Sequence, residues 1–205
     1  ITLATLPAST RVVDGQILAT IKIIPYATHR DHVQAAKRAI KQKLRVHAIQ
    51  ANSACLIQTE LPSIKQQMLD KTRTVTEYRL IERNATLVNE ARVAHTEVAV
   101  CSALNQALSM SPDWILLFGA SAISDRCDVI PSAITQLGGQ IEHFGMPMDP
   151  GNLLLLAHIH DTLVIGMPGC GRSKKYNGLD KVMDRMACKV PVTRQRITTL
   201  GLGVL

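Results

Sequence analysis

The chain has few aromatic side chains and no long apolar run. Its 205 residues include one Trp, three Tyr and two Phe, so few rings are present on which bases could stack, which argues against binding of single-stranded nucleic acid. No uninterrupted apolar stretch approaches the roughly 20 residues needed to span a bilayer, and no charged segment followed by an apolar one opens the sequence. We therefore expect a protein that acts without nucleic acid and without a membrane.

Cysteine is sparse, and several familiar motifs are absent. The five cysteines are odd in number and form no C-x-x-C pair, which fits neither a disulfide framework nor a zinc site, so a reducing cytoplasm is the expected location. The spacings of a Walker loop, a dinucleotide-binding glycine loop and a serine-hydrolase elbow do not occur. The chain begins at Ile1 without methionine, and we expect it to be part of a longer polypeptide.

The residues that are present fit a globular domain with a basic character. Hydrophobic residues make up 46% of the chain, enough for the core of one domain with a small appendage. The formal net charge of +7 suits an anionic partner. The basic residues are scattered, however, and form local clusters only at 37–43 and 172–175.

From residue 54 onward, short apolar runs alternate with amphipathic segments. Each run is short enough for a strand and too continuous for a half-exposed one, which indicates buried parallel strands. The alternation predicts right-handed crossovers and an α/β fold, a three-layer α/β/α sandwich with a mostly parallel sheet. The predicted strands are 54–58, 85–88, 114–118, 140–144 and 162–166. In one intervening helix the expected buried face is Ala94, Val98, Cys101, Leu104 and Leu108.

The first 50 residues have a different pattern. Asp14-Gly15 lies between two β-prone runs within 11–24, which predicts a hairpin turn. Residues 31–44 have the spacing of a basic amphipathic helix. We therefore predict an N-terminal accessory β-hairpin and helix over residues 1–50, and a main domain over residues 51–205.

Three polar loops follow predicted strands. In a parallel sheet, ligands bind outside the carboxyl ends of the strands, so the loops that leave those ends are the first places to look for a site. The loops are 119–128, 145–152 and 166–173, and we expect all three to leave the same edge of the sheet.

The first of these loops is the richest in polar groups. Gly119 allows close approach of a ligand to the backbone, and Ser121 and Ser124 offer hydroxyls. Asp125 and Asp128 lie about one turn apart where a helix is expected to begin. Such a helix start offers free amides to an anion, whereas two carboxylates there would hold Mg²⁺ together with a substrate phosphate. The alternative is that an aspartate only caps the helix.

The other two loops carry weaker signals. Glycines at 166, 169 and 171 precede Arg172, Ser173 and Lys174, which suits a phosphate cradle with cationic donors, although a solvated glycine turn has the same composition. In the loop at 145–152, two prolines would hold Asp149 and Asn152 in fixed positions, but Pro-Gly is also ordinary turn chemistry.

These segments resemble a known family. The motifs GASAISDRCDVIP, HFGMPMDPGN and GMPGCGRS, with the downstream Asn177-Gly178, resemble the molybdopterin-binding domain of molybdenum-cofactor biosynthesis proteins. The segments ITLATLP, DGQILATIKIIPYA and LIQTELPSIKQQMLDKT are similar to the type fused to a molybdenum cofactor cytidylyltransferase-like domain. The resemblance covers most of the chain.

The resemblance implies a fold, a ligand and a set of roles. It implies the molybdopterin-binding fold, commonly trimeric, and a pterin dithiolene phosphate or its adenylylated form as ligand. By position, Gly119, Ala120 and Ser121 correspond to the glycine-rich loop, and Asp128 to the aspartate of a D-V-x-P segment. The remaining correspondences are Pro150-Gly151 with a pterin-side turn, and Pro168-Gly169 and Ser173 with the last L-P-G loop.

Two positions depart from the family pattern. Ala120 stands where a threonine or second glycine is usual. A second acidic residue is expected near position 95, where this chain has His95-Thr96-Glu97, so Glu97 is the expected substitute. This departure bears on catalysis more than on binding.

The expected function is binding of molybdopterin or the molybdenum cofactor during its biosynthesis, with possible presentation to a nucleotidyltransferase domain. If the protein is an enzyme, it would be an Mg²⁺-dependent transferase that transfers an adenylyl or cytidylyl group from ATP or CTP, or that inserts molybdate. In either reaction, Asp128 and Asp125 would hold the metal or orient the phosphate. The alternatives are a non-catalytic oligomerisation scaffold and a nucleotide pyrophosphatase of the competence-damage type. A homo-oligomer, trimer or dimer, is expected. The expected ligand-binding residues are Gly119, Ala120, Ser121, Ser124, Asp149, Pro150, Gly151, Asn152, Pro168, Gly169, Arg172, Ser173 and Lys174.

Overall fold

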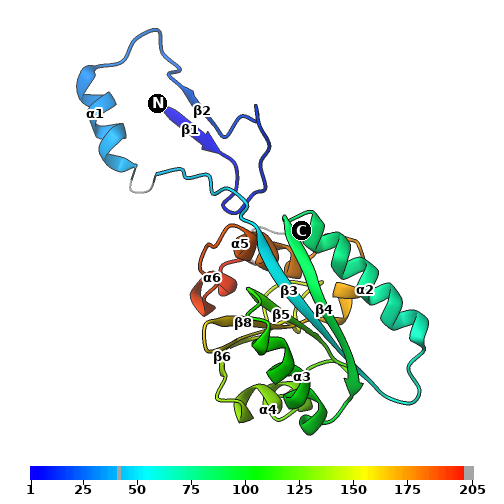
Figure 1. The fold of residues 1–205 in the computed structure, drawn as a ribbon. Coiled ribbons are helices and arrows are strands. Elements are labelled where there is room, and N and C mark those ends of the chain that lie inside the picture. The colour runs from blue at the N-terminus through cyan, green and yellow to red at the C-terminus, as the bar shows by residue number, and fades with distance from the viewer. Residues whose placement is uncertain (41–42, 201–205) are drawn as a thin grey trace. The chain divides into compact units, whose positions relative to one another are not determined.

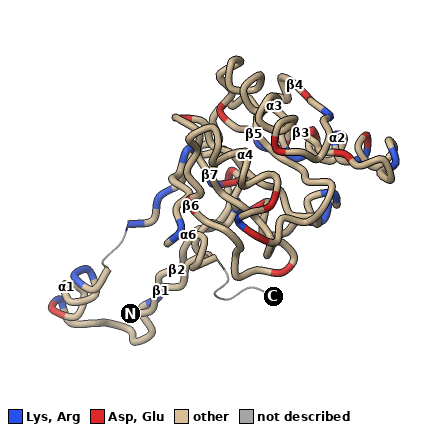
Figure 2. Tube along the Cα trace, turned by 90° about the horizontal axis from the view of Figure 1, so that it is seen from below, with Lys and Arg blue, Asp and Glu red and all other residues tan. Residues whose placement is uncertain are grey.

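The computed structural model describes residues 1–40 and 43–200 and divides into two compact units, 1–48 and 49–205. The basic cluster at 37–43 and the predicted helix at 31–44 lie partly outside the described residues. Residues 1–48 contain eight Lys or Arg and two Asp or Glu, a formal charge of +6, which leaves +1 of the total +7 for the rest of the chain. Figure 2 shows Lys and Arg side by side along the helix of the first unit.

The first unit is a two-stranded hairpin followed by one helix (Figure 1). Strand β1 (Thr2–Thr5) pairs antiparallel with β2 (Ala19–Lys22), and helix α1 spans Arg30–Ala39. The predicted hairpin is present, but Asp14-Gly15 lies in the long connection between the strands, because residues 11–13 form no strand. None of the described residues of this unit is buried.

The main unit is built on a six-stranded sheet of order β4-β3-β5-β8-β7-β6. All five predicted strands are present, and the predicted fold class is confirmed. Pairs β3-β4, β3-β5 and β5-β8 are parallel. The strands are β3 (Asn52–Glu60), β4 (Ala85–Ala94), β5 (Trp114–Phe118), β6 (Gln140–Phe144), β7 (Leu155–Ile159) and β8 (Thr162–Gly166).

Strand β7 was not predicted, and it changes the position of β6. It pairs antiparallel with β8 through a tight turn at His160 and Asp161, and antiparallel with β6 on its other side. Strand β6 is therefore a half-exposed outer strand, which corrects the expectation of a buried parallel one. Because both β6 and β8 run antiparallel to β7, they run in the same direction.

Helices cover both faces of the sheet in three layers (Figure 1). On one face, α2 (Gln66–Ile81), α5 (Gly178–Ala187) and α6 (Arg194–Thr198) share a buried cluster with alternate strand residues such as Leu56 and Leu116. On the other face, α3 (Glu97–Ser109) and α4 (Val129–Gln136) pack on Ile57 and Leu117. A short 3₁₀ helix, η1 (Gly169–Arg172), precedes α5. Within the described ranges, no helix is long and apolar enough to cross a bilayer.

Helix α3 is rotated relative to the expected face. It buries Val100, Ala103, Leu104 and Ala107, whereas Val98 is 82% exposed. The helix begins at Glu97 after the N-cap Thr96, and the small alanines on the sheet side let the helix approach the strands closely. The expected face included Val98, but the buried face of this alanine-rich helix includes Ala103 and Ala107, which the apolar pattern did not single out.

Strand β4, an outer strand, carries a β-bulge. Leu87 pairs with Ala54 and Asn89 pairs with the next residue, Cys55, so Val88 has no partner in β3. The side chain of Val88 is half-exposed. The bulge separates the first residues of the strand from its polar second half, which contains Glu90 and Arg92.

The directions of the strands bring the three polar loops to one edge. Strands β5, β6 and β8 run in the same direction, so loops 119–128, 145–152 and 166–173 all leave the carboxyl edge of the sheet. The chain passes from β3 to β4 on one side and then to β5 on the other. The strand order therefore reverses between β3 and β5, and the carboxyl ends at such a reversal are the usual place for a ligand in open α/β sheets.

Candidate anion-binding site

A chain of hydroxyl and imidazole groups links β3 to the loop that follows β5. The buried Thr59, near the end of β3, accepts a hydrogen bond at Oγ1 from the amide of Ala120 at 2.7 Å. The same oxygen lies 2.8 Å from Nδ1 of His95, and Nε2 of His95 lies 3.3 Å from Oγ of Ser121. Both ring nitrogens of His95 are thus engaged, and the exposed Ser121 hydroxyl is oriented at the edge of the sheet.

The carboxylate of Asp128 closes the 119–128 loop on itself. Its Oδ2 accepts hydrogen bonds from the amides of Ser124 at 2.7 Å and Asp125 at 2.9 Å. These two bonds lower the pKa of Asp128 below its usual value, and the bond from the Ser124 amide has the larger effect. The nearby His95 adds a smaller effect in the same direction. Asp128 stands at the N-cap position of α4, yet its side chain makes no capping bond to the helix. Its visible role is to hold the loop rather than to cap α4.

The two predicted metal ligands are only partly free. Asp125 accepts a bond from the amide of Cys127 at its Oδ1, at 2.7 Å, while Asp128 uses Oδ2 for the loop. Among the described residues, Oδ1 of Asp128 has no hydrogen-bond partner, whereas Asp125 also interacts with the Cys127 side chain. In the part of the chain that the structure describes, no group of three or more His, Cys, Asp or Glu side chains could hold a metal ion. An Mg²⁺ ion here would depend on oxygens supplied by a phosphate ligand.

Arg172 joins the loop at 166–173 to the loop at 119–128. Its guanidinium lies over the ring of Phe118, 4.9 Å from the centroid, and donates a hydrogen bond from Nη2 to the carbonyl of Gly119 at 2.9 Å. Burial lowers the pKa of Arg172, although an arginine stays cationic at neutral pH. Among the described residues, no carboxylate pairs with Arg172, and its Nε has no hydrogen-bond partner. A partly buried cation without a counter-charge favours an anionic ligand.

The remaining residues of the third loop have separate surroundings. Pro168 is buried, and Gly169, which follows it, is exposed with open space at its Cα. Ser173 is exposed, and the ammonium of Lys174 lies 5.0 Å from the ring centroid of Tyr78 on α2. Lys174 therefore contacts α2 instead of the group around Arg172.

The loop at 145–152 packs against the start of α5. The amide of Gly178 donates to the carbonyl of Pro150 at 3.0 Å, and the peptide bond between Asp149 and Pro150 is cis. Gly151 has φ of +128°, and a Cβ there would lie 3.0 Å from the Cα of Gly178, so only glycine fits. The side chains of Asp149 and Asn152 are exposed. No hydrogen bond between this loop and the 119–128 loop is recorded for the described residues.

The acidic substitute expected from the sequence does not join the site. Oε2 of Glu97 accepts a hydrogen bond from Gln136 of α4, whereas His95 occupies the position beside Ser121. His95 and Thr59 were missed because their role depends on which strands are neighbours. His95 directly follows β4, so the rule that sites lie at carboxyl ends of strands could have identified it.

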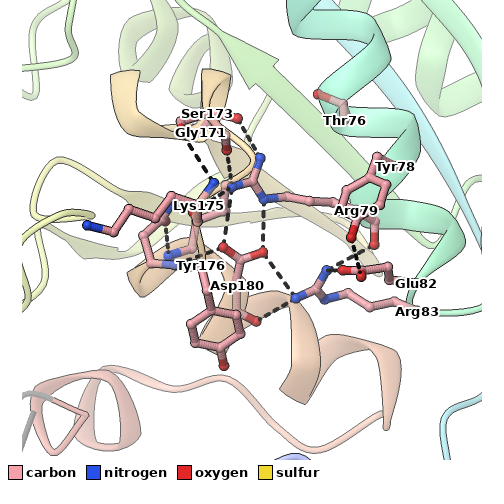
Figure 3. Close-up of polar contacts among 12 residues, drawn as sticks. Thr76, Tyr78, Arg79, Glu82, Arg83, Gly171, Ser173, Lys175, Tyr176 and Asp180 are labelled. Carbon is pink, nitrogen blue, oxygen red and sulfur yellow. Dashed lines mark hydrogen bonds and ion pairs between the residues drawn. The ribbon is translucent and has the colours of Figure 1, made fainter.

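A second group missed from the sequence is a buried charge cluster beneath the third loop (Figure 3). Arg79 of α2 and Arg83, which lies in the turn just after α2, point toward Asp180 of α5, with nitrogen-oxygen distances of 2.9 and 3.1 Å. Arg83 also pairs with Asp184 at 2.8 Å, and Tyr176 donates to the same carboxylate at 2.9 Å. Burial and the charge of Asp184 raise the pKa of Tyr176. The cluster fixes the loop between η1 and α5 to helix α2.

An open hollow of about 340 Å³ lies at the opposite edge of the sheet. Residues at or near the amino ends of three strands line it, including Asn52, Trp114 and Leu163. Its Asp113 is already bonded to Ser53 and lies 3.6 Å from Lys189. None of the predicted site residues lines this hollow.

Comparison with known proteins gives the fold but no close relative. No protein-family model matches the chain, and no curated protein matches it. Among solved structures, the molybdopterin biosynthesis protein MoeA from Pyrococcus horikosii is 15% identical, with a TM-score of 0.50 over 68% of this chain and 35% of that one. The matched part thus spans about a third of that protein.

Two shorter solved proteins match over nearly their whole length. The molybdopterin biosynthesis Mog protein from Mycobacterium ulcerans is 19% identical, with a TM-score of 0.46 over 68% of this chain and 97% of that one. The tungsten cofactor synthesizing protein MoaB from Pyrococcus furiosus is 14% identical, with a TM-score of 0.42 over 70% of this chain and 91% of that one. Identities this low speak for the fold alone. The main unit has an α/β/α fold of the kind solved for molybdopterin biosynthesis proteins.

Proposed function

We propose that residues 49–205 bind molybdopterin or the molybdenum cofactor through its terminal phosphate, during biosynthesis of that cofactor in the cytoplasm. The observation that carries the proposal is Arg172, a partly buried guanidinium for which no described carboxylate serves as partner. A phosphate would supply the missing counter-charge and accept from its free N–H groups. The Ser121 hydroxyl and His95, 3.3 Å from each other, lie at the same edge of the sheet and would offer further polar contacts.

The pterin end of the ligand would lie toward the loop at 145–152. The exposed Asp149 and Asn152 side chains offer acceptors to the amine and amide groups of a pterin. Gly151 and Gly178 keep that loop close against α5. A site of this kind binds an elongated molecule that carries a phosphate at one end and hydrogen-bond donors at the other.

Catalysis is a further part of the proposal. If the protein transfers an adenylyl or cytidylyl group from ATP or CTP, or inserts molybdate, Mg²⁺ would neutralise charge on the phosphates. The carboxylates of Asp128 and Asp125 would contact the ion, while Arg172 orients the phosphate. A homo-oligomer and a cytidylyltransferase-like domain in the full-length chain belong to the same proposal.

Titration calorimetry with molybdopterin tests the binding site. We expect the Arg172→Gln variant to bind at least about tenfold more weakly, because it loses a charge-assisted hydrogen bond. Arg196→Gln on α6, an exposed arginine outside the three loops, is the matched control and should bind like the unmodified chain. Absence of binding by the unmodified chain, or equal affinities for Arg172→Gln and the control, would overturn the proposal.

The role of Asp128 is tested by the same titration with and without Mg²⁺. If Asp128 holds the ion, added Mg²⁺ strengthens binding by the unmodified chain but not by Asp128→Asn. The alternatives have their own signatures. A scaffold would form oligomers on a sizing column without affinity for the pterin, and a pyrophosphatase would release AMP from a dinucleotide.

A further inference from the structure

One arginine holds three carbonyl groups of the loop that precedes α5. The guanidinium of Arg79 donates to the carbonyls of Gly171 at 2.7 Å, Ser173 at 2.5 Å and Lys175 at 3.4 Å (Figure 3). Asp180 pairs with it from the other side at 2.9 Å, and the Arg79 side chain is 2% exposed. A single buried cation therefore fixes every second peptide group over residues 171–175.

This pattern determines where the amides of the loop point. In a trans peptide, the carbonyl of one residue and the N–H of the next point in opposite directions. Since the carbonyls of Ser173 and Lys175 face Arg79, the amides of Lys174 and Tyr176 face away from it. A row of backbone amides directed outward is a recognised way to bind an anion.

The hydrogen bonds of the loop amides have the same alternation. The amides of residues 173, 175 and 177 are bonded within the protein, to the carbonyl of Cys170, to Oγ of Ser173 and to Oδ2 of Asp180. For the amides of Lys174 and Tyr176, no acceptor is recorded within the described ranges of the chain. The amides of Lys174 and Tyr176 are thus two donors without an acceptor among the described residues, on a segment in which the amides of residues 173, 175 and 177 are all engaged.

We propose that Arg79 is a positioning residue that, held by Asp180, turns the amides of Lys174 and Tyr176 outward to bind a phosphate group of the ligand. The inference rests on the proposed function for the identity of that ligand. Arg79 itself touches no ligand, because it lies on the inner side of the loop. If Arg79 were only structural, its replacement would lower the stability of the fold but would not change how strongly the amides of Lys174 and Tyr176 respond to phosphate.

The amide of Lys174 can be removed without touching the buried cluster. The backbone of Ser173, at φ of −106° and ψ of 146°, is already in the region required before proline. We expect Lys174→Pro to bind inorganic phosphate about tenfold more weakly than Lys174→Ala, because the two variants lose the same ammonium and only the first loses the N–H. Equal affinities of the two variants would overturn the proposal.

The positioning role is tested by NMR of the labelled whole chain titrated with inorganic phosphate. In the unmodified chain, the amide signals of Lys174 and Tyr176 should shift with phosphate. Arg79→Lys keeps a charge but loses the fork that holds three carbonyls, so these two signals should respond at least about fivefold more weakly. Arg73→Lys, an exposed arginine of the same helix paired with Glu77, is the control and should behave like the unmodified chain.

The outcomes separate this inference from the proposed function. Unchanged responses at 174 and 176 in Arg79→Lys would overturn the positioning role, whatever molybdopterin does. Shifts at 174 and 176 that depend on Arg79, in a chain that does not bind molybdopterin, would support the positioning role and overturn the proposed ligand. If Arg79→Lys does not fold, the comparison of Lys174→Pro with Lys174→Ala decides the matter.

Discussion

At the scale of single residues, Asp128 illustrates how one carboxylate can hold a loop together and still keep an oxygen without a hydrogen-bond partner among the described residues. Its carboxylate accepts two short amide bonds and so keeps the 119–128 loop compact. The remaining oxygen stays available to a metal or a ligand donor. The loop geometry that holds Asp128 is thus also what positions its free oxygen.

The depressed pKa of Asp128 gives a pH dependence of defined sign. Because the pKa is lower in the folded loop, the stabilisation is fully present above about 3.9, the usual carboxyl value, and is lost as pH falls through the lower folded value. We expect the amide signals of Ser124 and Asp125 to titrate with a midpoint below that of a model peptide. Asp128→Asn should remove this titration. A midpoint at or above the peptide value would contradict the assignment.

His95 explains why the site was only partly predictable. The loop residues Ser121, Asp128 and Arg172 could be found because glycine, hydroxyl and charged residues gather after apolar runs. Predicting the contacts of His95 with Thr59 and Ser121 requires the knowledge that β3 and β5 are neighbours. Local composition does not determine that strand order. Glu97 was preferred over His95 for its charge, but in the structure Glu97 accepts a hydrogen bond from Gln136, whereas His95 contacts Ser121.

At the scale of elements, the junction of α2 and α5 depends on buried charges. Asp180 compensates two arginines whose side chains are 2% or less exposed. We expect Asp180→Asn to lower the free energy of unfolding by about 3 kcal/mol, because it leaves both guanidinium groups without their shared partner. Urea denaturation measures the change. Asp70→Asn, which removes an exposed partner of Arg92, is the control and should cost less than about 1 kcal/mol.

The contact between the 145–152 loop and α5 depends on a glycine. We expect Gly151→Ala to cost about 3 kcal/mol, because φ of +128° and the nearby backbone of Gly178 both exclude a Cβ. Gly138→Ala, at φ of +75° with nothing within 4 Å of the added carbon, should cost only about 1 kcal/mol. Thermal unfolding of the two variants measures the difference. Equal losses of stability would show that the close contact between Gly151 and Gly178 does not contribute to the cost.

Element positions were more predictable than element neighbours. Runs such as Trp114–Phe118 are continuous enough to identify a strand from sequence. Strand β7 was missed although Leu153 to Ala157 is also a continuous apolar run, and its place in the sheet follows only from its antiparallel pairing with β6 and β8. Arg79 was missed because it appears on an otherwise ordinary polar helix, and its burial follows only from the approach of Asp180.

At the scale of the whole molecule, the two units differ in core and in charge. Residues 49–205 contain both buried clusters, whereas residues 1–48 bury no described side chain and form one two-stranded hairpin and one helix. Such a hairpin is marginal alone in water. The first unit also carries nearly all of the net positive charge.

Truncation tests the independence of the main unit. We expect residues 49–205 to unfold cooperatively with a midpoint close to that of the whole chain, because no cluster of its core includes a residue of the first unit. Residues 1–48 alone should give no cooperative transition by circular dichroism. A large loss of stability on removing residues 1–48 would instead mean that the first unit contributes to the core.

The bulge at Val88 has a consequence for association between molecules. Strand β4 is the last strand on its side of the sheet, and a long regular outer strand invites pairing with the same strand of another copy. By inserting an unpaired residue, the bulge bends and twists β4 where it would otherwise offer an even ladder of donors and acceptors. The bulge therefore disfavours the addition of further strands along the outer edge of β4, and any association between copies of the chain would use other surfaces.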